Sequence, residues 1–529
     1  MSAKTLAETG PPQLQARLSL NSAIPKSRSV PTPTFTLDNS YARELPGCYV
    51  AWPPAPVAAP RLLYFNRELA HELGLGLDTA DTDELAALFS GKALPEHAAP
   101  IAQAYAGHQF GNFSPQLGDG RALLIGEIID CHGRRRDLAF KGSGRTPFSR
   151  NGDGKAAVGP MLREVLIGEA MHALGIPTTR ALAVVATGEP VYREQTLPGA
   201  ILTRVAASHI RVGTFEYFAA RDDRERVKQL ADYSIARHDA ELVNAPDRHV
   251  QWLRAVALRQ SALLARWMNV GFIHGVMNTD NMSISGESID FGPCAFMEAY
   301  HPATVFSSID QHGRYAYARQ PGIAQWNLAR FAEAILPLLA DDEDQAVDIA
   351  TEILAGFGEN YRRHWLQGVR AKLGLNVHYA PATDGDRRDT ALAEDWLALL
   401  EAGGIDYTLA WRHLADAAEG RAEPLQALFA DTAGLQTWLL RWEERCAAEP
   451  AQAAALRAQA MRRVNPRIIP RNHRVELALD AASQQGELGP FDELLDALRR
   501  PFDDDPQLAR YAEPAPSGYT EGYRTFCGT

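Results

Sequence analysis

A change of pattern near residue 225 constrains the fold of this chain more than any other sequence feature. Before it, short apolar runs alternate with glycine-rich turns, which predicts strands at 122–129, 137–141, 181–186 and 200–205 and a helix at about 159–174. After it the apolar spacing is helical, which predicts helices at 252–270, 326–339 and 342–357 and more helices from 391 to about 500. Strands first and helices later predict an α+β, two-lobed fold.

Composition excludes several classes of protein. The 529 residues are 46% hydrophobic and 22% charged, which allows a sizeable core and excludes global disorder. The formal net charge of -12 argues against a nucleic-acid-binding surface, so no nucleic-acid partner is expected. No apolar run approaches the roughly 18–20 residues that span a bilayer, so no membrane segment is predicted. The five cysteines form no C-x-x-C pair, which argues against a zinc module or a disulfide scaffold.

The strongest local signal is the loop sequence HGVMNTDN at 274–281, followed by an Asp-Phe-Gly motif that begins at Asp290. Asn281 and Asp290 offer the hard oxygen ligands that Mg²⁺ prefers. In protein kinases the catalytic loop reads H-x-D-x-x-x-x-N and is followed by Asp-Phe-Gly. Here Val276 occupies the place of the catalytic aspartate, and valine cannot accept a proton. Asp280 is the one nearby carboxylate that could act instead.

Lysine and arginine side chains upstream of this loop are suited to phosphate. Lys141 ends a predicted strand, and Glu164 follows 23 residues later on a predicted helix, as in the kinase pair that grips phosphates. Arg204 and Arg211 are seven residues apart, and guanidinium groups bind phosphate oxygens in pairs. Glycine-rich segments at 118–121, 142–145 and 152–155 would let backbone N–H groups approach a nucleotide.

Taken together, these blocks closely resemble the selenoprotein O family from about residue 40 to the end. The resemblance is carried by YAGHQFG (105–111), PQLGDGR (115–121), GSGRTPFSR (142–150), GIPTTR (175–180), SHIRVGTFE (208–216), NTDN (278–281), QWNL (325–328) and the terminal CGT (527–529).

The resemblance implies a pseudokinase that binds ATP in a flipped orientation, with the α-phosphate facing the acceptor. It implies transfer of AMP to Ser, Thr or Tyr hydroxyls of proteins, self-modification included, with release of pyrophosphate and with Mg²⁺, or alternatively Mn²⁺, as the cation. By position, Asp280 matches the proton acceptor, Asn281 and Asp290 match metal ligands, and Asp290 also matches a nucleotide contact. Lys141 and Glu164 match the pair that grips phosphate, and Arg204 and Arg211 match contacts with the terminal phosphates. The other matched nucleotide contacts are Gly118, Gly120, Arg121, Asp153 and Gly154.

The resemblance also concerns the chain end, because some family members carry selenocysteine where Cys527 stands. In some bacterial relatives this terminal cysteine pairs with another in the catalytic lobe, and Phe306 stands at the matching position here, which puts that disulfide in doubt. Cys294 is a substitute partner, and the alternative is that Cys294 is a small buried core residue.

The fold class predicted is therefore α+β: a bilobal protein-kinase-like fold with a β-rich N-lobe, a helical C-lobe and additional C-terminal helices. The predicted parts are a disordered tail (1–35), an N-terminal extension with the N-lobe (36–215), the C-lobe (216–390) and a helical extension with the terminal cysteine (391–529).

The predicted function is a protein adenylyltransferase. Three alternatives stay open: a phosphotransferase with a relocated base, an inactive pseudokinase scaffold, and a thiol redox protein that uses Cys527. The predicted location is a bacterial cytoplasm, with a mitochondrial location as the alternative for a eukaryotic protein.

Overall fold

The computed structural model describes residues 35–376, 385–450 and 452–526. Residues 1–34 of the predicted disordered tail and Cys527 lie outside these ranges. Phe35, at the start of the described part, is already buried.

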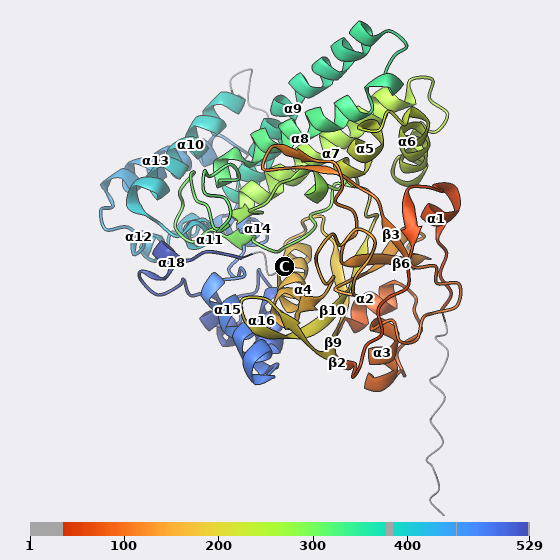
Figure 1. Cartoon of the computed structure of the whole chain (residues 1–529). Coiled ribbons are helices and arrows are strands. Elements are labelled where there is room, and N and C mark those ends of the chain that lie inside the picture. The colour runs from red at the N-terminus through yellow and green to blue at the C-terminus, as the bar shows by residue number, and fades with distance from the viewer. Residues whose placement is uncertain (1–34, 377–384, 451, 527–529) are drawn as a thin grey trace, which may run out of the picture. The chain divides into compact units, whose positions relative to one another are not determined.

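An antiparallel sheet of eight strands occupies the first half of the chain (Figure 1). The strands pair in the order β1-β3-β6-β7-β10-β9-β2, and β8 pairs with β10. They are β1 (Tyr49–Ala51), β2 (Arg61–Phe65), β3 (Ile101–Gln103), β6 (Ala122–Ile129), β7 (Arg135–Lys141), β8 (Ala156–Ala157), β9 (Arg180–Tyr192) and β10 (Thr196–Ala206). All four predicted strands are confirmed, and β6 has the predicted bounds. The hairpin of β9 and β10 is longer than predicted, because its pairing continues through the polar residues after Ala186.

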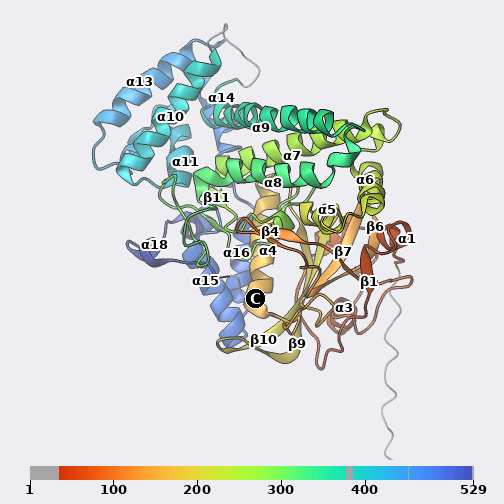
Figure 2. The same cartoon turned by 45° about the horizontal axis from the view of Figure 1, so that its top comes forward.

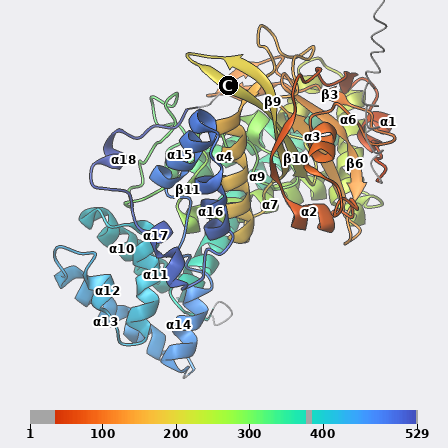
Figure 3. The ribbon, with the colours of Figure 1, turned by 90° about the horizontal axis from the view of Figure 1, so that it is seen from below.

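The first of the long helices, α4 (Val158–Ala173), is buried around nearly its whole circumference. One side packs on β9 and β10, and another packs on α15 (Asn472–Asp480) and α16 (Gly489–Leu498), which lie beside it in Figure 3. The side chains of Leu162, Val165 and Leu166 on this helix are fully buried. The chain's C-terminal helices therefore help to hold the helix that carries Glu164.

The middle of the chain is helical, as predicted. Its helices are α5 (Val212–Ala219), α6 (Arg224–His238), α7 (Arg248–Val270), α8 (Gln320–Ala334) and α9 (Glu343–Lys372). Three shorter helices precede the long strands: α1 (Ser40–Glu44), α2 (Arg67–Glu72) and α3 (Thr82–Phe89). Short 3₁₀ turns are η1 (Ala240–Leu242), η2 (Thr279–Asn281), η3 (Tyr317–Arg319) and η4 (Leu336–Leu338).

Several helix bounds differ from the prediction: α7 and α8 begin earlier, at Arg248 and Gln320, and α8 and α9 end elsewhere. Helix α8 ends at Ala334, because Pro337 cannot continue an α-helix and lies in the separate turn η4. Helix α9 runs 15 residues beyond the predicted end at Phe357, through Gly358, because buried Leu366 and Val369 continue its apolar face. The residues directly before Asp290 form no strand, and an isolated bridge joins Thr178 and Ser288 there.

The last part of the described chain is also helical. Its remaining elements are α10 (Gly385–Gly403), α11 (Tyr407–Ala418), α12 (Glu423–Gln426), α13 (Ala433–Ala447), α14 (Ala454–Arg462), the π-turn η5 (Ala481–Gln485), η6 (Pro506–Leu508), α17 (Ala509–Ala512) and α18 (Tyr519–Gly522). Four buried tryptophans from α10, α11 and α13 form the centre of its core. The described residues thus form a mixed α and β fold with an antiparallel sheet. They contain no helix that is both long and apolar enough to cross a membrane.

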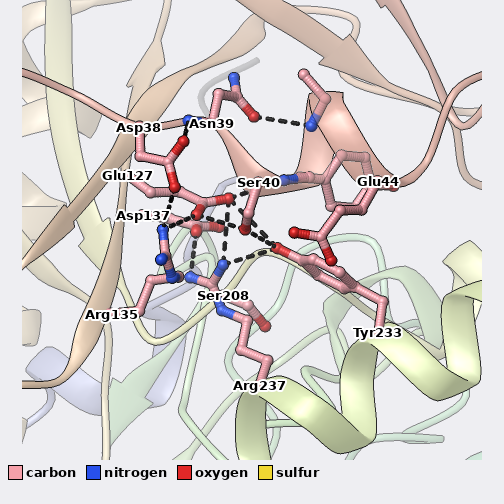
Figure 4. A network of polar contacts seen from close by, with 12 residues as sticks. Asp38, Asn39, Ser40, Glu44, Glu127, Arg135, Asp137, Ser208, Tyr233 and Arg237 are labelled. Carbon is pink, nitrogen blue, oxygen red and sulfur yellow. Dashed lines mark hydrogen bonds and ion pairs between the residues drawn. The ribbon is translucent and has the colours of Figure 1, made fainter.

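A buried polar network joins the start of the described chain to the sheet and to α6 (Figure 4). Glu127 on β6 is fully buried and accepts hydrogen bonds from Ser40 Oγ at 2.6 Å and from the Tyr41 backbone N–H at 3.0 Å. Two arginines also form ion pairs with its carboxylate: Arg135 Nη1 at 2.7 Å and Arg237 Nη1 at 3.2 Å. A buried carboxylate with this many donors is stable only while its partners remain.

Glu127→Gln is expected to lower the free energy of unfolding by about 3 kcal/mol, because the two arginines keep their charge while their buried partner loses its own. Equilibrium urea unfolding measures the change. Glu44→Gln is the matched control: Glu44 lies near the same network (Figure 4) but is exposed, and among the described residues its side chain has only a 3.3 Å contact with Arg43. Equal stabilities of the two variants would contradict the assigned importance of the network.

Candidate active site

A cavity of about 750 Å³ collects the residues that the sequence singled out. Its walls come from the sheet, from the glycine-rich loops and from the loop region between Val276 and Pro293. The predicted site residues that line it are Gly118, Gly120, Arg121, Lys141, Asp153, Gly154, Arg204, Arg211, Asp280, Asn281 and Asp290. Glu164 does not line the cavity but contacts two residues that do.

The pairing of β7 with β10 brings Lys141 and Arg204 to one face of the sheet. Lys141 pairs with Leu202, and Arg204 pairs with Ala139, so the two cations are diagonal neighbours. Both reach Glu164 on α4: Lys141 Nζ lies 2.5 Å from Oε1, and Arg204 Nη2 lies 2.9 Å from Oε2. The kinase-like pair expected from the spacing of Lys141 and Glu164 is thus formed, and Arg204 joins it.

Asp290 contacts the same two cations. Its Oδ1 lies 2.6 Å from Lys141 Nζ and 2.5 Å from Arg204 Nη2, and its Oδ2 lies 3.9 Å from Arg211 Nη2. Burial alone would raise the pKa of Asp290, but the charges of Arg204, Lys141 and Arg211 outweigh it and hold the pKa well below its usual range. Asp290 is therefore ionised and is the carboxylate on which three cations converge.

Several buried guanidinium nitrogens near the cavity have no hydrogen-bond partner within the described residues. They are Arg121 Nη1, Arg204 Nε and Arg211 Nε. Arg211 also lies over the ring of Tyr105, with its guanidinium carbon 4.6 Å from the ring centroid. Unpaired buried donors cost free energy, so this wall of the cavity is suited to an anionic ligand.

The loop with Asp280 and Asn281 forms the turn η2. Asn281 donates its side-chain N–H to the Val276 carbonyl at 3.0 Å, which leaves its amide oxygen for a cation. Burial raises the pKa of Asp280 to about 6, although the charge of Arg211 opposes the shift. Val276, which stands at the sequence position of the kinase catalytic aspartate, lines the cavity.

The glycine-rich loops that line the cavity pack on one another. Gly118 has φ +69°, and a side chain there would overlap the ring of Phe148. Gly154 has φ +68° and lies against the backbone of Gly144. Asp153 forms a two-bonded ion pair with Arg193, at 2.9 and 3.0 Å. These conformations let the loops form a close-fitting wall, and the sequence did not predict the partner of Asp153.

The sequence assigned no role to the hairpin of β4 (Gly107–Gln109) and β5 (Asn112–Ser114), although β4 belongs to the block YAGHQFG. The hairpin contacts η2 and α5, and it lies beside α5 in Figure 2. Gln109 and Phe110 line the cavity, as do Phe148 and Ile309 from other loops. The signal that could have found the hairpin is the clustering of polar and aromatic residues around Gly107 and Gly111 in a non-helical segment.

The residues present fit a Mg²⁺ ion held jointly with a nucleotide. The described residues contain no group of three or more His, Cys, Asp or Glu side chains that could hold a metal. Within the described residues Asp290 Oδ2 has only the long contact with Arg211, so it and the amide oxygen of Asn281 can serve as hard ligands. Mg²⁺ in nucleotide sites is typically held by one or two such groups, with phosphates and water completing its shell.

The cysteines of the described residues are free: Cys48, Cys131, Cys294 and Cys446. Cys294 is fully buried, and its thiol donates to the Phe291 carbonyl, which favours the interpretation as a core residue. Phe306 packs against Tyr523, with ring centroids 5.8 Å apart. A disulfide of Cys527 would involve a residue outside the described ranges.

Comparison with known proteins identifies the family. The family model described as protein adenylyltransferase SelO matches residues 35–499. The protein nucleotidyltransferase YdiU of Chromobacterium violaceum is 61% identical over 487 residues, which cover 92% of this chain and 100% of that protein. The proteins of the same name from Cereibacter sphaeroides and Rhizobium etli are 61% and 56% identical over 499 and 512 residues, covering 94% and 96% of this chain and all of each relative.

These matches confirm the predicted resemblance and the prediction of an enzyme, a nucleotidyltransferase with nucleotide and protein substrates. The chain belongs to the protein adenylyltransferase SelO family.

Proposed function

We propose that the cavity binds ATP with Mg²⁺ and transfers AMP to Ser, Thr or Tyr hydroxyls of proteins, the enzyme itself included. The observation that carries this proposal is the convergence of Lys141, Arg204 and Arg211 on Asp290, in a cavity that also holds Asp280. Three cations suit a polyphosphate, and a carboxylate beside them can take the proton of an attacking hydroxyl.

We also propose that the fold is kinase-like, with residues 36–215 and 216–390 corresponding to its two lobes and 391–529 to an added helical part. The support is local. A sheet strand carries Lys141, the helix packed on that sheet carries Glu164, and a loop from the helical part carries Asn281 and Asp290. These are the parts with which kinases hold ATP.

In the proposed reaction the acceptor oxygen attacks the α-phosphorus, and the bond from that phosphorus to the oxygen bridging to the β-phosphate breaks. The electron pair of this bond leaves with pyrophosphate, and the hydroxyl proton passes to Asp280. Arg204 and Arg211, with Lys141 held by Glu164, stabilise the charge that develops on the leaving group. Gly118, Gly120, Arg121, Asp153 and Gly154 would line the rest of the nucleotide.

A bound Mg²⁺ would neutralise phosphate charge as a Lewis acid, held by Asn281 and Asp290, with Mn²⁺ able to serve the same ligands. Val276 supports AMP transfer over phosphate transfer, since the position that activates the acceptor in kinases carries no acid or base. A location in the bacterial cytoplasm stays a prediction.

The test is incubation of the enzyme and Mg²⁺ with proteins of a bacterial extract and ATP labelled at either the α- or the γ-phosphorus. We expect label on protein only from α-labelled ATP, with one pyrophosphate released for each AMP transferred. Asp290→Asn is the negative control. Label from the γ position alone would show a phosphotransferase, and no label from either position would refute group transfer.

A further inference from the structure

We propose that Gln109 is a positioning residue of the reaction: its side-chain amide holds the Asp280 carboxylate in the orientation that receives the acceptor hydroxyl. The proposal deepens the proposed AMP transfer and rests on it. It concerns a residue of the β4–β5 hairpin, far from the loop of Asp280 in the sequence but in contact with it in the structure.

The hairpin is fixed to the loop on both sides of Gln109. The backbone N–H of His108 donates to Thr279 Oγ1 at 2.7 Å, and the backbone N–H of Phe110 donates to Asn278 Oδ1 at 3.1 Å. Two consecutive loop side chains thus bind the backbone on either side of Gln109. Since side chains alternate along a strand, the one between these contacts has a defined direction.

Further contacts hold these two anchors in place. Glu216 on α5 binds both His108 Nδ1 and Thr279 Oγ1, and its carboxylate is buried. Tyr315 Oη donates to Asn278 Oδ1 at 2.6 Å. These hydrogen bonds join the hairpin to the loop and to α5, and they fix the position of Gln109 beside Asp280.

Gln109 Nε2 lies 3.5 Å from Asp280 Oδ2, and within the described residues no other side chain donates to this carboxylate. Asp280 Oδ1 is buried without a hydrogen-bond partner there, and it lies against the backbone of Gly107, where an added Cβ would come within 2.8 Å of it. The absence of a side chain at Gly107 thus leaves room for Oδ1, and Gln109 reaches Oδ2.

An amide suits this role because it donates a hydrogen bond to a carboxylate and does not compete for the proton. Gln109 also lines the cavity, so it lies where an acceptor approaches. Without the amide, Asp280 loses the contact that sets its angle to the acceptor hydroxyl. A misdirected base lowers the rate of the chemical step and leaves nucleotide binding intact.

The experiment compares Gln109→Met, which has a similar length but no donor, with Gln109→Glu, which places a second carboxylate beside Asp280. Transfer of α-labelled AMP to extract proteins gives kcat and the KM for ATP, and calorimetry gives the Kd for ATP with Mg²⁺. We expect kcat to fall about 10- to 100-fold in Gln109→Met and further in Gln109→Glu, with the Kd for ATP within about twofold of wild type in Gln109→Met. Asn112→Ala is the control, because Asn112 is an exposed residue of the same hairpin.

A kcat of Gln109→Met within about twofold of wild type would overturn the proposal. A parallel loss of ATP binding would also overturn it, since Gln109 would then support the fold of the hairpin rather than orient Asp280. If wild-type enzyme transfers no AMP, the proposed function fails; if wild type transfers and Gln109→Met matches it, only the role of Gln109 fails.

Discussion

Asp290→Asn is expected to lower the rate of AMP transfer at least about 1000-fold and to make ATP binding insensitive to Mg²⁺. The carboxylate is both a proposed metal ligand and the partner on which Lys141, Arg204 and Arg211 converge. Asparagine keeps the shape but loses the charge that a divalent cation needs. The three cations remain, so the variant still attracts the phosphates of ATP without metal.

Asparagine is chosen because it suits the backbone conformation at position 290 as well as the size of the side chain. Asp290 has φ +64°, a left-handed conformation that asparagine adopts more readily than alanine does. Asp222→Asn is a matched control, because Asp222 also has a positive φ, +53°, but is exposed in the turn after α5. We expect this control to transfer AMP at the wild-type rate.

Calorimetric titration with ATP, once with Mg²⁺ and once with EDTA, measures the effect of the metal. Wild type should bind more tightly with Mg²⁺, and Asp290→Asn should give the same Kd in both titrations. A Mg²⁺ effect of equal size in wild type and variant would show that the cation has other ligands, and the site assignment would be wrong.

The contacts that follow from local pattern were predictable from the sequence. Strand β6 has the bounds that its apolar run and flanking turns indicated. The meeting of Lys141 with Glu164 followed from a known spacing between a strand lysine and a helix glutamate. Both depend on nearby residues and on a recurrent arrangement of one strand and one helix.

Contacts that depend on register and on distant packing were not predictable. Arg204 reaches Glu164 and Asp290 because β10 pairs with β7 in one particular register, and a shift by one residue would turn Arg204 to the other face. The strands of the β4–β5 hairpin have three residues each, too few for a periodic signal. Their stability comes from contacts with Asn278 and Thr279, about 170 residues away in sequence.

The cost of burying Asp280 is itself an argument for function. Burial raises its pKa, Oδ1 has no partner in the described part of the chain, and its only side-chain donor is at 3.5 Å. A carboxylate needed only for stability would be expected to have closer partners, as Glu127 has. Under-satisfied carboxylates in a cavity are typical of groups that exchange protons with a substrate.

Asp280→Asn is accordingly expected to lower kcat for AMP transfer by about 10²- to 10⁴-fold, because the amide cannot accept the hydroxyl proton. ATP binding should stay close to wild type, since Lys141, Arg204, Arg211 and Asp290 are unchanged. This separates Asp280 from Asp290, whose replacement should alter both transfer and the metal dependence of binding.

Transfer of α-labelled AMP and calorimetry on the same preparation measure the two effects. Leu258→Ala, at an exposed position on α7, controls for effects of mutation and purification that are unrelated to the site. It should behave as wild type in both measurements. Transfer by Asp280→Asn at more than about a tenth of the wild-type rate would show that another group accepts the proton. Loss of ATP binding together with transfer would instead place Asp280 among the groups that hold the nucleotide, and the acceptor hydroxyl would then need a base elsewhere in the cavity.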